Sequence, residues 1–244
     1  MARNTTFANH ISVIVPVYNE SGVINDTLDH LRRTSGQASV EIVVADGGPG
    51  HATLAAVTDG QAVRVKCPQG RGVQMNAGAA MATGDVFLFL HADTRLPEGW
   101  PGLVRGALVD NVRAGAFSLG FDSDRLSMRV VALFANLRTR IERLPYGDQA
   151  PFLAADLFRE MGGFAGIPIM EDVDLFSRLR QRGERIALLR ERVATSPRRY
   201  ETDGVGRRVA ANWWLRLRYG LGVSPHKLAG EYRPQAQTGG GEGR

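Results

Sequence analysis

A short apolar run, Val86–Leu90, constrains the fold of this chain more than any other feature of its sequence. The run carries no charge, mixes aromatic and aliphatic side chains, and has the turn-forming residues Gly84 and Asp85 directly before it. Such a run is typical of a strand that is buried on both faces of a parallel sheet. His91 and Asp93 follow it at the carboxyl end, which is where open α/β sheets bind their ligands. Taken alone, Asp93 is explained equally well as a cap of the next turn.

Strands and helices alternate along the first half of the chain, which predicts an α/β fold with a mostly parallel, doubly wound sheet flanked by helices. The sequence contains neither the glycine fingerprint of dinucleotide-binding proteins nor a Walker A loop, which argues against a nicotinamide-dependent dehydrogenase. The predicted strands are Ile11–Val17, Val40–Ala45, Ala62–Cys67 and Val86–Leu90, and the predicted helices run from Ser21 to about Arg33, from about Ala52, and from about Gly72 to Ala82.

The second half continues the α/β pattern and ends in a predicted helical appendage. We assign no strand to the arginine-rich segment that follows the helix opened by Glu171. The predicted elements are a helix ending near Val109, a strand at Ala114–Phe121, a helix at Leu126–Leu144, a strand at Phe152–Ala154, and helices at Val205–Gly220 and from Ser224. The expected organisation is an N-terminal tail (1–10), one α/β domain (11–200), a C-terminal helical segment (201–234) and a disordered tail (235–244).

Cysteine content and hydropathy indicate where the chain works. Its single cysteine, Cys67, excludes a disulfide within the chain and suits a reducing cytoplasm. No apolar run approaches the ~20 residues that a membrane-spanning helix needs, and residues 1–10 lack the apolar core of a signal peptide. We therefore expect a cytoplasmic protein, either soluble or peripheral at the inner face of the cell membrane.

Positive charge is concentrated late in the sequence. The net charge is +5, but the segment from Arg178 to Arg218 holds twelve arginines against four acidic residues. Genome composition alone can produce such usage, and so can an anionic partner such as a diphosphate, a lipid headgroup or a nucleic acid.

Five short motifs occur in one order along the chain. They are Ile14–Glu20, Asp46–Gly48, Gly84–Asp85 leading to His91–Asp93, Gly162–Phe164, and Glu171–Asp172. Together they resemble the motifs of family 2 glycosyltransferases of the GT-A fold. Three further segments, Arg71–Gly78, Gly147–Gln149 and the region from Asn212 to Pro225, are similar to a small bacterial subgroup labelled arsenosugar-type or radical-SAM-associated transferases.

The resemblance implies a metal-dependent enzyme that moves a sugar from a nucleotide-diphosphate donor to a hydroxyl group, with inversion. On the donor side, Asp93 would hold Mn²⁺ or Mg²⁺ against the diphosphate, where the metal acts as a Lewis acid. Arg71 could reach the diphosphate through its forked guanidinium, and Asp46 would hydrogen-bond the base or ribose. The other residues expected to bind the nucleotide sugar are Pro16, Tyr18, Glu20 and Asn76.

On the acceptor side, the resemblance implies that Asp172 is the general base of a single displacement. Glu171 would orient the acceptor or tune Asp172 through like-charge proximity. Asp148 and Gln149 are expected near the acceptor, which is a small molecule or a lipid-linked hydroxyl compound. We expect no nucleic-acid partner.

Three departures from the family pattern affect the choice of metal, the contacts with the sugar donor and the number of sugars added per cycle. His91 replaces the first acid of the usual DxD motif, so it becomes a candidate metal ligand, and imidazole suits Mn²⁺ better than Mg²⁺. The loop after Asp46 reads Pro49–His51 in place of Ser-x-Asp, which affects the usual contacts of that loop. The Gln-x-x-Arg-Trp motif of processive synthases is absent, so we expect one sugar per cycle.

Alternatives from other classes stay open at this point. Nucleotidyl transferases use a similar sheet, but they place a glycine-rich, arginine-containing loop after the first strand, where this chain has Val17–Glu20. A nucleic-acid-binding module could use the arginines of residues 178–218, although few aromatic residues interleave them. A catalytically decayed relative of the family is the third alternative.

Two predicted helices pair an apolar stripe with arginines. We expect the stripe of Leu126–Leu144 to pack on the domain's own core. For Val205–Leu221, which carries Trp213 and Trp214, core packing and docking on an anionic membrane remain open, because Arg207, Arg208, Arg216 and Arg218 gather around the tryptophans.

Overall fold

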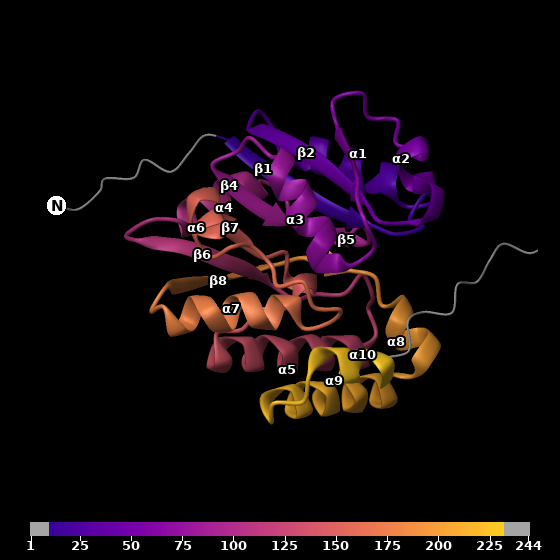
Figure 1. Cartoon of the computed structure of the whole chain (residues 1–244), viewed down its shortest axis with the longest axis vertical. Helices are drawn as coiled ribbons and strands as arrows, with labels where there is room; N and C mark the ends of the chain where they lie inside the picture. Colours follow the sequence, from indigo (N-terminus) through magenta and orange to yellow (C-terminus); the bar gives the residue numbers. More distant parts are fainter. Residues whose placement is uncertain (1–9, 232–244) are drawn as a thin grey trace, which may run out of the picture.

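A seven-stranded sheet forms the centre of the computed structural model, which describes residues 10–231 (Figure 1). The strand order is β3-β2-β1-β4-β7-β6-β8. The pairs β1–β2, β2–β3, β1–β4 and β6–β8 are parallel, and only β7 runs antiparallel to its neighbours β4 and β6. The strands are β1 (His10–Val17), β2 (Ser39–Asp46), β3 (Val63–Lys66), β4 (Val86–Phe89), β6 (Val112–Ser118), β7 (Phe152–Ala154) and β8 (Arg185–Arg192).

Helices follow the strands, and a small second sheet holds the loop after β4. That sheet pairs β5 (Thr94–Arg95) antiparallel with β9 (Ala194–Thr195). The helices are α1 (Ile24–Thr34), α2 (Ala52–Ala56), α3 (Arg71–Met81), α4 (Trp100–Ala107), α5 (Leu126–Glu142), α6 (Ala155–Glu160), α7 (Glu171–Gln181), α8 (Arg198–Asp203), α9 (Val205–Gly220) and α10 (Pro225–Glu231), with 3-10 turns at Pro49–His51 (η1) and Gly147–Gln149 (η2).

Side chains of β1 alternate between two apolar clusters, one on each face of the sheet. Val13 and Val15 belong to the cluster that contains Leu28 of α1, and Ile14 belongs to the cluster that contains Met75 of α3. Both faces of β1 are therefore buried in apolar clusters. β2 and β4 also contribute residues to both clusters, which explains why the three strands appear in the sequence as apolar runs. The sheet is closed in on both sides, and only the strand ends are available for a ligand.

The predicted fold class is confirmed, because the sheet is mostly parallel and flanked by helices. The arginine-rich segment, however, contains a strand that the sequence did not predict. β8 lies at the edge of the sheet, where Ile186 is its only buried residue and its arginines face solvent. Its apolar run, Ile186–Leu189, is short, stands between arginines and is only partly buried, so it resembles a central strand less closely. The first helix also starts later than predicted, at Ile24 and not after Ser21.

The predicted packing of Leu126–Leu144 is wrong. α5 buries Met128, Ala132 and Thr139, while Leu126 and Ile141 are each 74% exposed. Only Leu144, beyond the end of the helix, is buried as predicted. Periodicity identified an apolar face on this helix but not the direction in which it points.

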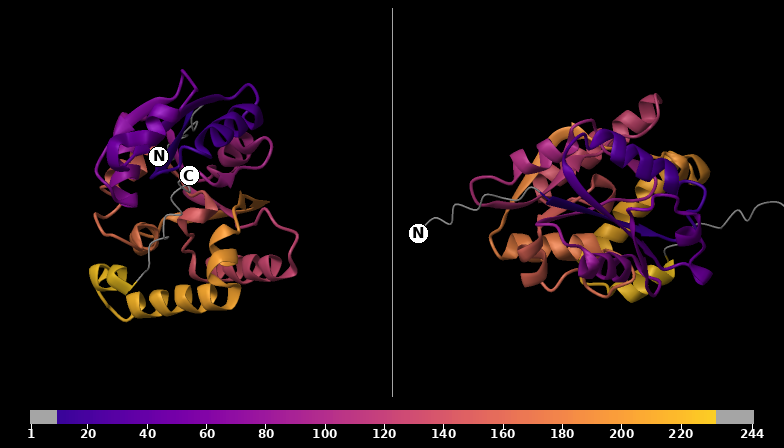
Figure 2. Two further views of the ribbon diagram at one scale, coloured as in Figure 1. Left: turned by 90° about the vertical axis from the view of Figure 1, so that its right-hand side faces the viewer. Right: turned by 90° about the horizontal axis from the view of Figure 1, so that it is seen from above.

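The terminal segments are only partly covered. Residues 1–9 of the expected N-terminal tail and all of the expected disordered tail at 235–244 lie outside the described residues, whereas His10 already belongs to β1. The expected C-terminal helical segment appears as α8, α9 and α10, at the end of the molecule opposite β1 and β2 (Figure 2). Between residues 10 and 231, no helix has the length and apolar character needed to cross a membrane.

Candidate active site

A cavity of about 460 Å³ opens at the carboxyl ends of β1 and β4. Residues from six parts of the chain line it: the end of β1 with the loop after it, the start of α3, the loop after β4, Phe121, the segment from Tyr146 to Val173, and the C-terminal part from Thr195 to Leu215. The cavity therefore lies where parallel sheets place their ligands. It joins residues that the sequence assigned to the donor with residues that it assigned to the acceptor.

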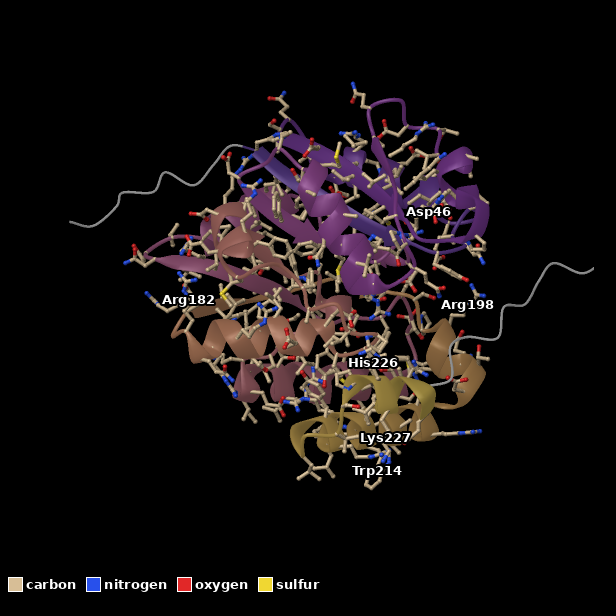
Figure 3. The ribbon with its side chains drawn as sticks, in the orientation of Figure 1. Asp46, Arg182, Arg198, Trp214, His226 and Lys227 are labelled. Carbon is tan, nitrogen blue, oxygen red and sulfur yellow. The ribbon has the colours of Figure 1, made fainter. Side chains whose placement is uncertain are left out.

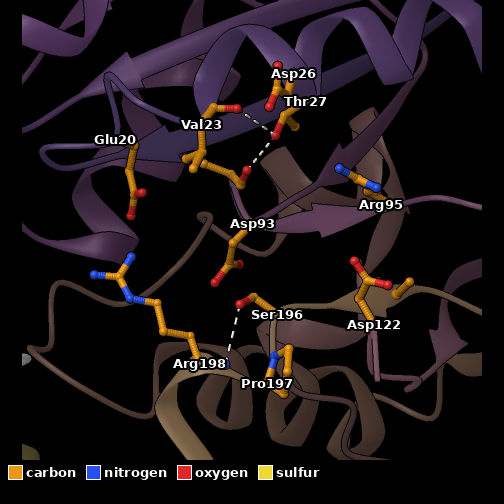
Figure 4. A pocket seen from close by; sticks show the side chains of 12 residues that line it. Glu20, Val23, Asp26, Thr27, Asp93, Arg95, Asp122, Ser196, Pro197 and Arg198 are labelled. Atoms are coloured by element: carbon orange, nitrogen blue, oxygen red, sulfur yellow. Dashed lines mark hydrogen bonds between the residues drawn. The ribbon is translucent and has the colours of Figure 1, made fainter. Parts of the chain in front are cut away.

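Asp93 lies at the boundary of this cavity and a second, smaller one of about 240 Å³, and it lines both. Figure 4 shows its exposed carboxylate among Glu20, Ser196 and Arg198. The β5–β9 pair fixes the loop, because the backbone N–H of Ser196 donates to the carbonyl oxygen of Asp93 at 3.2 Å. A charged carboxylate is thus presented on a rigid loop.

His91 also lines the large cavity, and its imidazole lies next to Gly147. A Cβ atom added to Gly147 would lie 2.9 Å from His91 Nε2 and 3.6 Å from Asp172 Oδ2, so only glycine fits between these side chains. The imidazole is half-buried and close to Asp172. The sequence predicts His91 and Asp93 together as metal ligands and does not predict that His91 lies near Asp172.

The donor groups around Asp93 fit a cation that is shared with phosphate oxygens. Within residues 10–231, no group of three or more His, Cys, Asp or Glu side chains forms a metal cage. Mg²⁺ commonly binds through one or two carboxylates, with substrate phosphates and water as its other ligands. One exposed carboxylate beside a cavity satisfies that requirement.

Asp172 is held at the start of α7 by two backbone N–H groups. Its Oδ2 accepts a hydrogen bond from Gly147 at 2.7 Å, and its Oδ1 accepts one from Val173 at 2.7 Å. The residue is half-buried and lines the large cavity. Because both oxygens are oriented by backbone groups, the carboxylate keeps one direction.

Glu171, next in the chain, is only 2% exposed and pairs with Arg71 from the start of α3. The distance from Arg71 Nη1 to Glu171 Oε1 is 3.3 Å. Burial raises the pKa of the Glu171 carboxyl above its ordinary value, the Arg71 guanidinium acts against this rise, and the charge of Asp172 adds to it. Arg71 thus links the donor side of the cavity to the pair of acids on α7.

Tyr146 lines the same cavity and was not identified from the sequence. The guanidinium carbon of Arg138 lies 3.4 Å above the centre of its ring. Burial raises the pKa of Tyr146 to about 12, so its hydroxyl remains protonated at neutral pH. The sequence offered no signal for it beyond its place directly before Gly147.

Three predicted binding residues do not line the cavity. Asp46 is fully buried (Figure 3), and its two oxygens accept from the backbone of Gly48 at 2.7 Å and Leu54 at 3.3 Å. Asn76 exchanges two hydrogen bonds with the backbone of Phe164, at 2.8 and 2.9 Å. Both side chains stabilise loops near the cavity, so their direct contact with a ligand stays a prediction.

Gln149 is the third of these residues. It is 2% exposed, and its Oε1 accepts from Thr139 Oγ1 at 2.8 Å and from the backbone of Tyr146 at 3.1 Å. It therefore ties η2 to α5, whereas Asp148 beside it does line the cavity, as do Pro16, Tyr18 and Glu20.

The C-terminal helices add cavity residues that sequence reasoning did not select. Arg208, Asn212 and Leu215 lie on the inner side of α9, and all three line the cavity. The only signal for them was the similarity of the region from Asn212 to the bacterial subgroup. The helical appendage is thus part of the site.

Comparisons with known proteins agree with this geometry. A model of the family described as "Glycosyl transferase family 2" matches residues 12–167, more than half of the chain. A comparison with curated protein sequences finds no significant match.

Solved structures with a similar fold include three proteins determined in complex with UDP or GDP-Man. Glucosyl-3-phosphoglycerate synthase from Mycobacterium tuberculosis, in complex with Mn²⁺, UDP and phosphoglyceric acid, is 18% identical over 77% of this chain and 70% of that chain, with a TM-score of 0.57. Mannosyltransferase PcManGT from Pyrobaculum calidifontis, with GDP-Man and Mn²⁺, is 18% identical over 77% of this chain and 56% of that one, with a TM-score of 0.59.

The third is S. aureus TarS (1–349) in complex with UDP, which is 17% identical over 77% of this chain and 60% of that chain, with a TM-score of 0.60. At these identities the likeness concerns the fold, which is that of GT-A glycosyltransferases. With the family match, the sheet and the cavity at its carboxyl edge, the chain belongs to glycosyl transferase family 2 and is a glycosyltransferase.

Proposed function

We propose that this enzyme transfers one sugar per cycle from a nucleotide-diphosphate sugar to a hydroxyl acceptor, with inversion, in the cavity of about 460 Å³. The observation that supports the proposal best is that one cavity contains Asp93 and Arg71 together with Asp172. A single displacement needs a group that stabilises the leaving diphosphate and a base that receives the acceptor proton, and these residues supply both.

On the donor side, Pro16 near the end of β1 and Tyr18 and Glu20 in the loop after it bind the nucleoside. The guanidinium of Arg71 neutralises part of the diphosphate charge. Asp93 would hold Mn²⁺ or Mg²⁺, and the bound metal would supply Lewis-acid stabilisation of the leaving group. Complexes with UDP or GDP-Man and Mn²⁺ among the similar structures support this assignment.

On the acceptor side, Asp172 takes the proton of the acceptor hydroxyl. The bond from the acceptor oxygen to the anomeric carbon forms as the bond from that carbon to the phosphate oxygen breaks, and the nucleoside diphosphate leaves. The hydrogen bonds from Gly147 and Val173 keep the Asp172 carboxylate oriented for this transfer. Glu171 and Asp148 orient the acceptor, and the protonated Tyr146 hydroxyl is available as a donor.

The acceptor is a small molecule or a lipid-linked hydroxyl compound, because the resemblance to the bacterial subgroup is compatible with both. Arg208 and Asn212 on α9 lie at the cavity wall, where they can contact its polar part. Asp46, Asn76 and Gln149 contribute through the loops that they support.

The experiment that tests the donor site is a thermal-shift panel of nucleotide sugars, with and without Mn²⁺, because a ligand that binds the folded state raises Tm. We expect one class of nucleotide sugar to raise Tm in the presence of Mn²⁺, and Asp93→Ala to remove that rise. Asp122→Ala is the matched control, since Asp122 lines only the smaller cavity. Equal shifts for wild type and Asp93→Ala, with and without metal, would remove Asp93 from the donor site.

The same panel separates two roles of His91. If it binds the metal, His91→Ala shifts the preference from Mn²⁺ towards Mg²⁺. If it serves the acceptor half instead, where it lies beside Asp172, metal preference is unchanged and transfer alone falls.

A further inference from the structure

α5 turns its apolar side chains away from the protein. Leu126, Phe134 and Ile141 are 74%, 59% and 74% exposed, and they recur at the spacing of one helix face. The opposite face is the one that packs, and its buried residues are Met128, Ala132 and Thr139. Most of the large apolar side chains of this helix are therefore exposed, and an exposed apolar face of this kind requires a partner.

α9 shows the same arrangement. Trp213, Trp214 and Leu217 are 53%, 58% and 55% exposed, whereas Leu215 is the only buried residue of the helix and lines the cavity. Figure 3 shows Trp214 at the end of the molecule farthest from the sheet. The inner side of α9 thus belongs to the active site, and its outer side is apolar.

The two helices lie at the same end of the molecule in both views (Figures 1 and 2). Arg216 of α9 pairs with Glu142 at the end of α5, with 3.3 Å between Nη2 and Oε2. We call their outward apolar residues the α5–α9 surface, which consists of Leu126, Val130, Leu133, Phe134, Leu137, Ile141, Trp213, Trp214, Leu217 and Leu221. Exposed apolar groups gathered on such a scale mark an interaction site.

Charge indicates what this surface contacts. α5 contains three arginines and one acid, and α9 contains four arginines and no acid. Arg129, Arg140 and Arg207 are exposed, whereas Arg208, Arg216 and Arg218 are mostly buried in ion pairs. Arginines beside exposed leucine, phenylalanine and tryptophan are typical of helices that lie in a membrane interface.

A second copy of the chain fits the surface less well. A twofold dimer places the same patch on both subunits, so the basic rims of the two copies would repel each other. An anionic bilayer offers an apolar interior to the leucines and tryptophans, and negative headgroups to the arginines.

We propose that the α5–α9 surface docks the enzyme on an anionic lipid bilayer, with α9 separating the membrane from the active-site cavity. Docking depends on the α5–α9 surface alone and requires neither a bound sugar donor nor sugar transfer. It can therefore be tested independently of the proposed function. If it holds, the acceptor meets the enzyme at the membrane.

The test is co-sedimentation of the full chain with vesicles of phosphatidylglycerol and phosphatidylcholine, or of phosphatidylcholine alone, at low and at high salt. We expect sedimentation with the anionic vesicles at low salt and a loss of binding at high salt, because surface charge is screened. Leu133→Ser with Phe134→Ser, and separately Trp213→Ser with Trp214→Ser, should weaken binding about tenfold or more, because two large apolar side chains no longer leave water.

The chain offers a matched control. Met81 and Val109 are 55% and 51% exposed but lie on α3 and after α4, outside the surface. Met81→Ser with Val109→Ser removes a similar exposed apolar area and should leave vesicle binding unchanged. Replacing Arg129, Arg140 and Arg207 with glutamine should weaken binding to anionic vesicles and flatten its salt dependence.

Tryptophan fluorescence gives a second readout on protein that stays folded. Trp100 is fully buried, so a blue shift on adding vesicles comes from Trp213 and Trp214. The proposal is overturned by absence of sedimentation at low salt, by equal binding of wild type and surface variants, or by a dimer in sedimentation velocity that the surface variants abolish.

Discussion

α7 and α5 are neighbouring helices with opposite relations to the core. They touch where Arg180 of α7 donates to the carbonyl oxygen of Glu142, the last residue of α5, at 2.9 Å. α7 buries Phe176 completely, whereas Phe134 of α5 is 59% exposed. Each helix has an apolar face, but only α7 turns that face toward the sheet. An apolar stripe therefore predicts that a helix has a partner, and the fold decides whether that partner is inside the molecule.

The largest effect is expected at the first turn of α7. Asp172→Asn keeps the shape of the side chain, so folding and donor binding should survive while transfer falls by a factor of about 10²–10⁴. Steady-state transfer assays combined with thermal shifts would measure the two effects separately. Asp174→Asn is the control, because Asp174 lies in the same turn but pairs with Arg178 at 2.8 Å. Normal turnover by Asp172→Asn would show that the α7 acid is not the base.

The next largest effect is the difference in stability between alanine variants of Phe176 in α7 and Phe134 in α5. Phe176→Ala should lower the free energy of unfolding by about 3–5 kcal/mol, because it leaves a cavity in a dry core. Phe134→Ala should change it by no more than about 0.5 kcal/mol, since its side chain is already largely in water. Urea denaturation of both variants measures the difference. Similar losses for both would mean that α5 is packed against something within the monomer.

The smallest effect is the pH dependence of stability at Glu171. Its pKa is raised in the folded state above the ordinary value of 4.5, so between those two values the folded chain binds more protons than the unfolded chain. The contribution of Glu171 to the free energy of unfolding is therefore fully present below pH 4.5, and it is lost as the pH rises through the folded-state pKa. Relative to Glu171→Gln, the wild type should lose Tm over this range and then level off. A wild type that gains Tm instead would show that the ion pair with Arg71 outweighs burial.

The sequence predicted the parallel half of the fold because its strands are buried on both faces. β1, β2 and β4 all have this pattern, and the carboxyl ends of β1 and β4 located the cavity correctly. β8 was missed because its four-residue apolar run, Ile186–Leu189, lies between arginines in an edge strand that is only partly buried. Residue type also failed to predict where a polar side chain points. The side chains of Asp46 and Gln149 hydrogen-bond to groups in nearby loops and not to the cavity, and His91 points toward Gly147. Contacts between residues far apart in sequence decide these orientations.

The pairing of β6 with both β7 and β8 has a consequence for the order in which the chain folds. The ribosome completes β1–β4 within the first 89 residues, and these strands can pair among themselves at once. β6 has one free edge until Arg185–Arg192 has been synthesised. A free strand edge is the part of a nascent chain most prone to pair with another molecule. The residues that end this exposure follow directly after α7, so the part of the sheet around β6 is completed last.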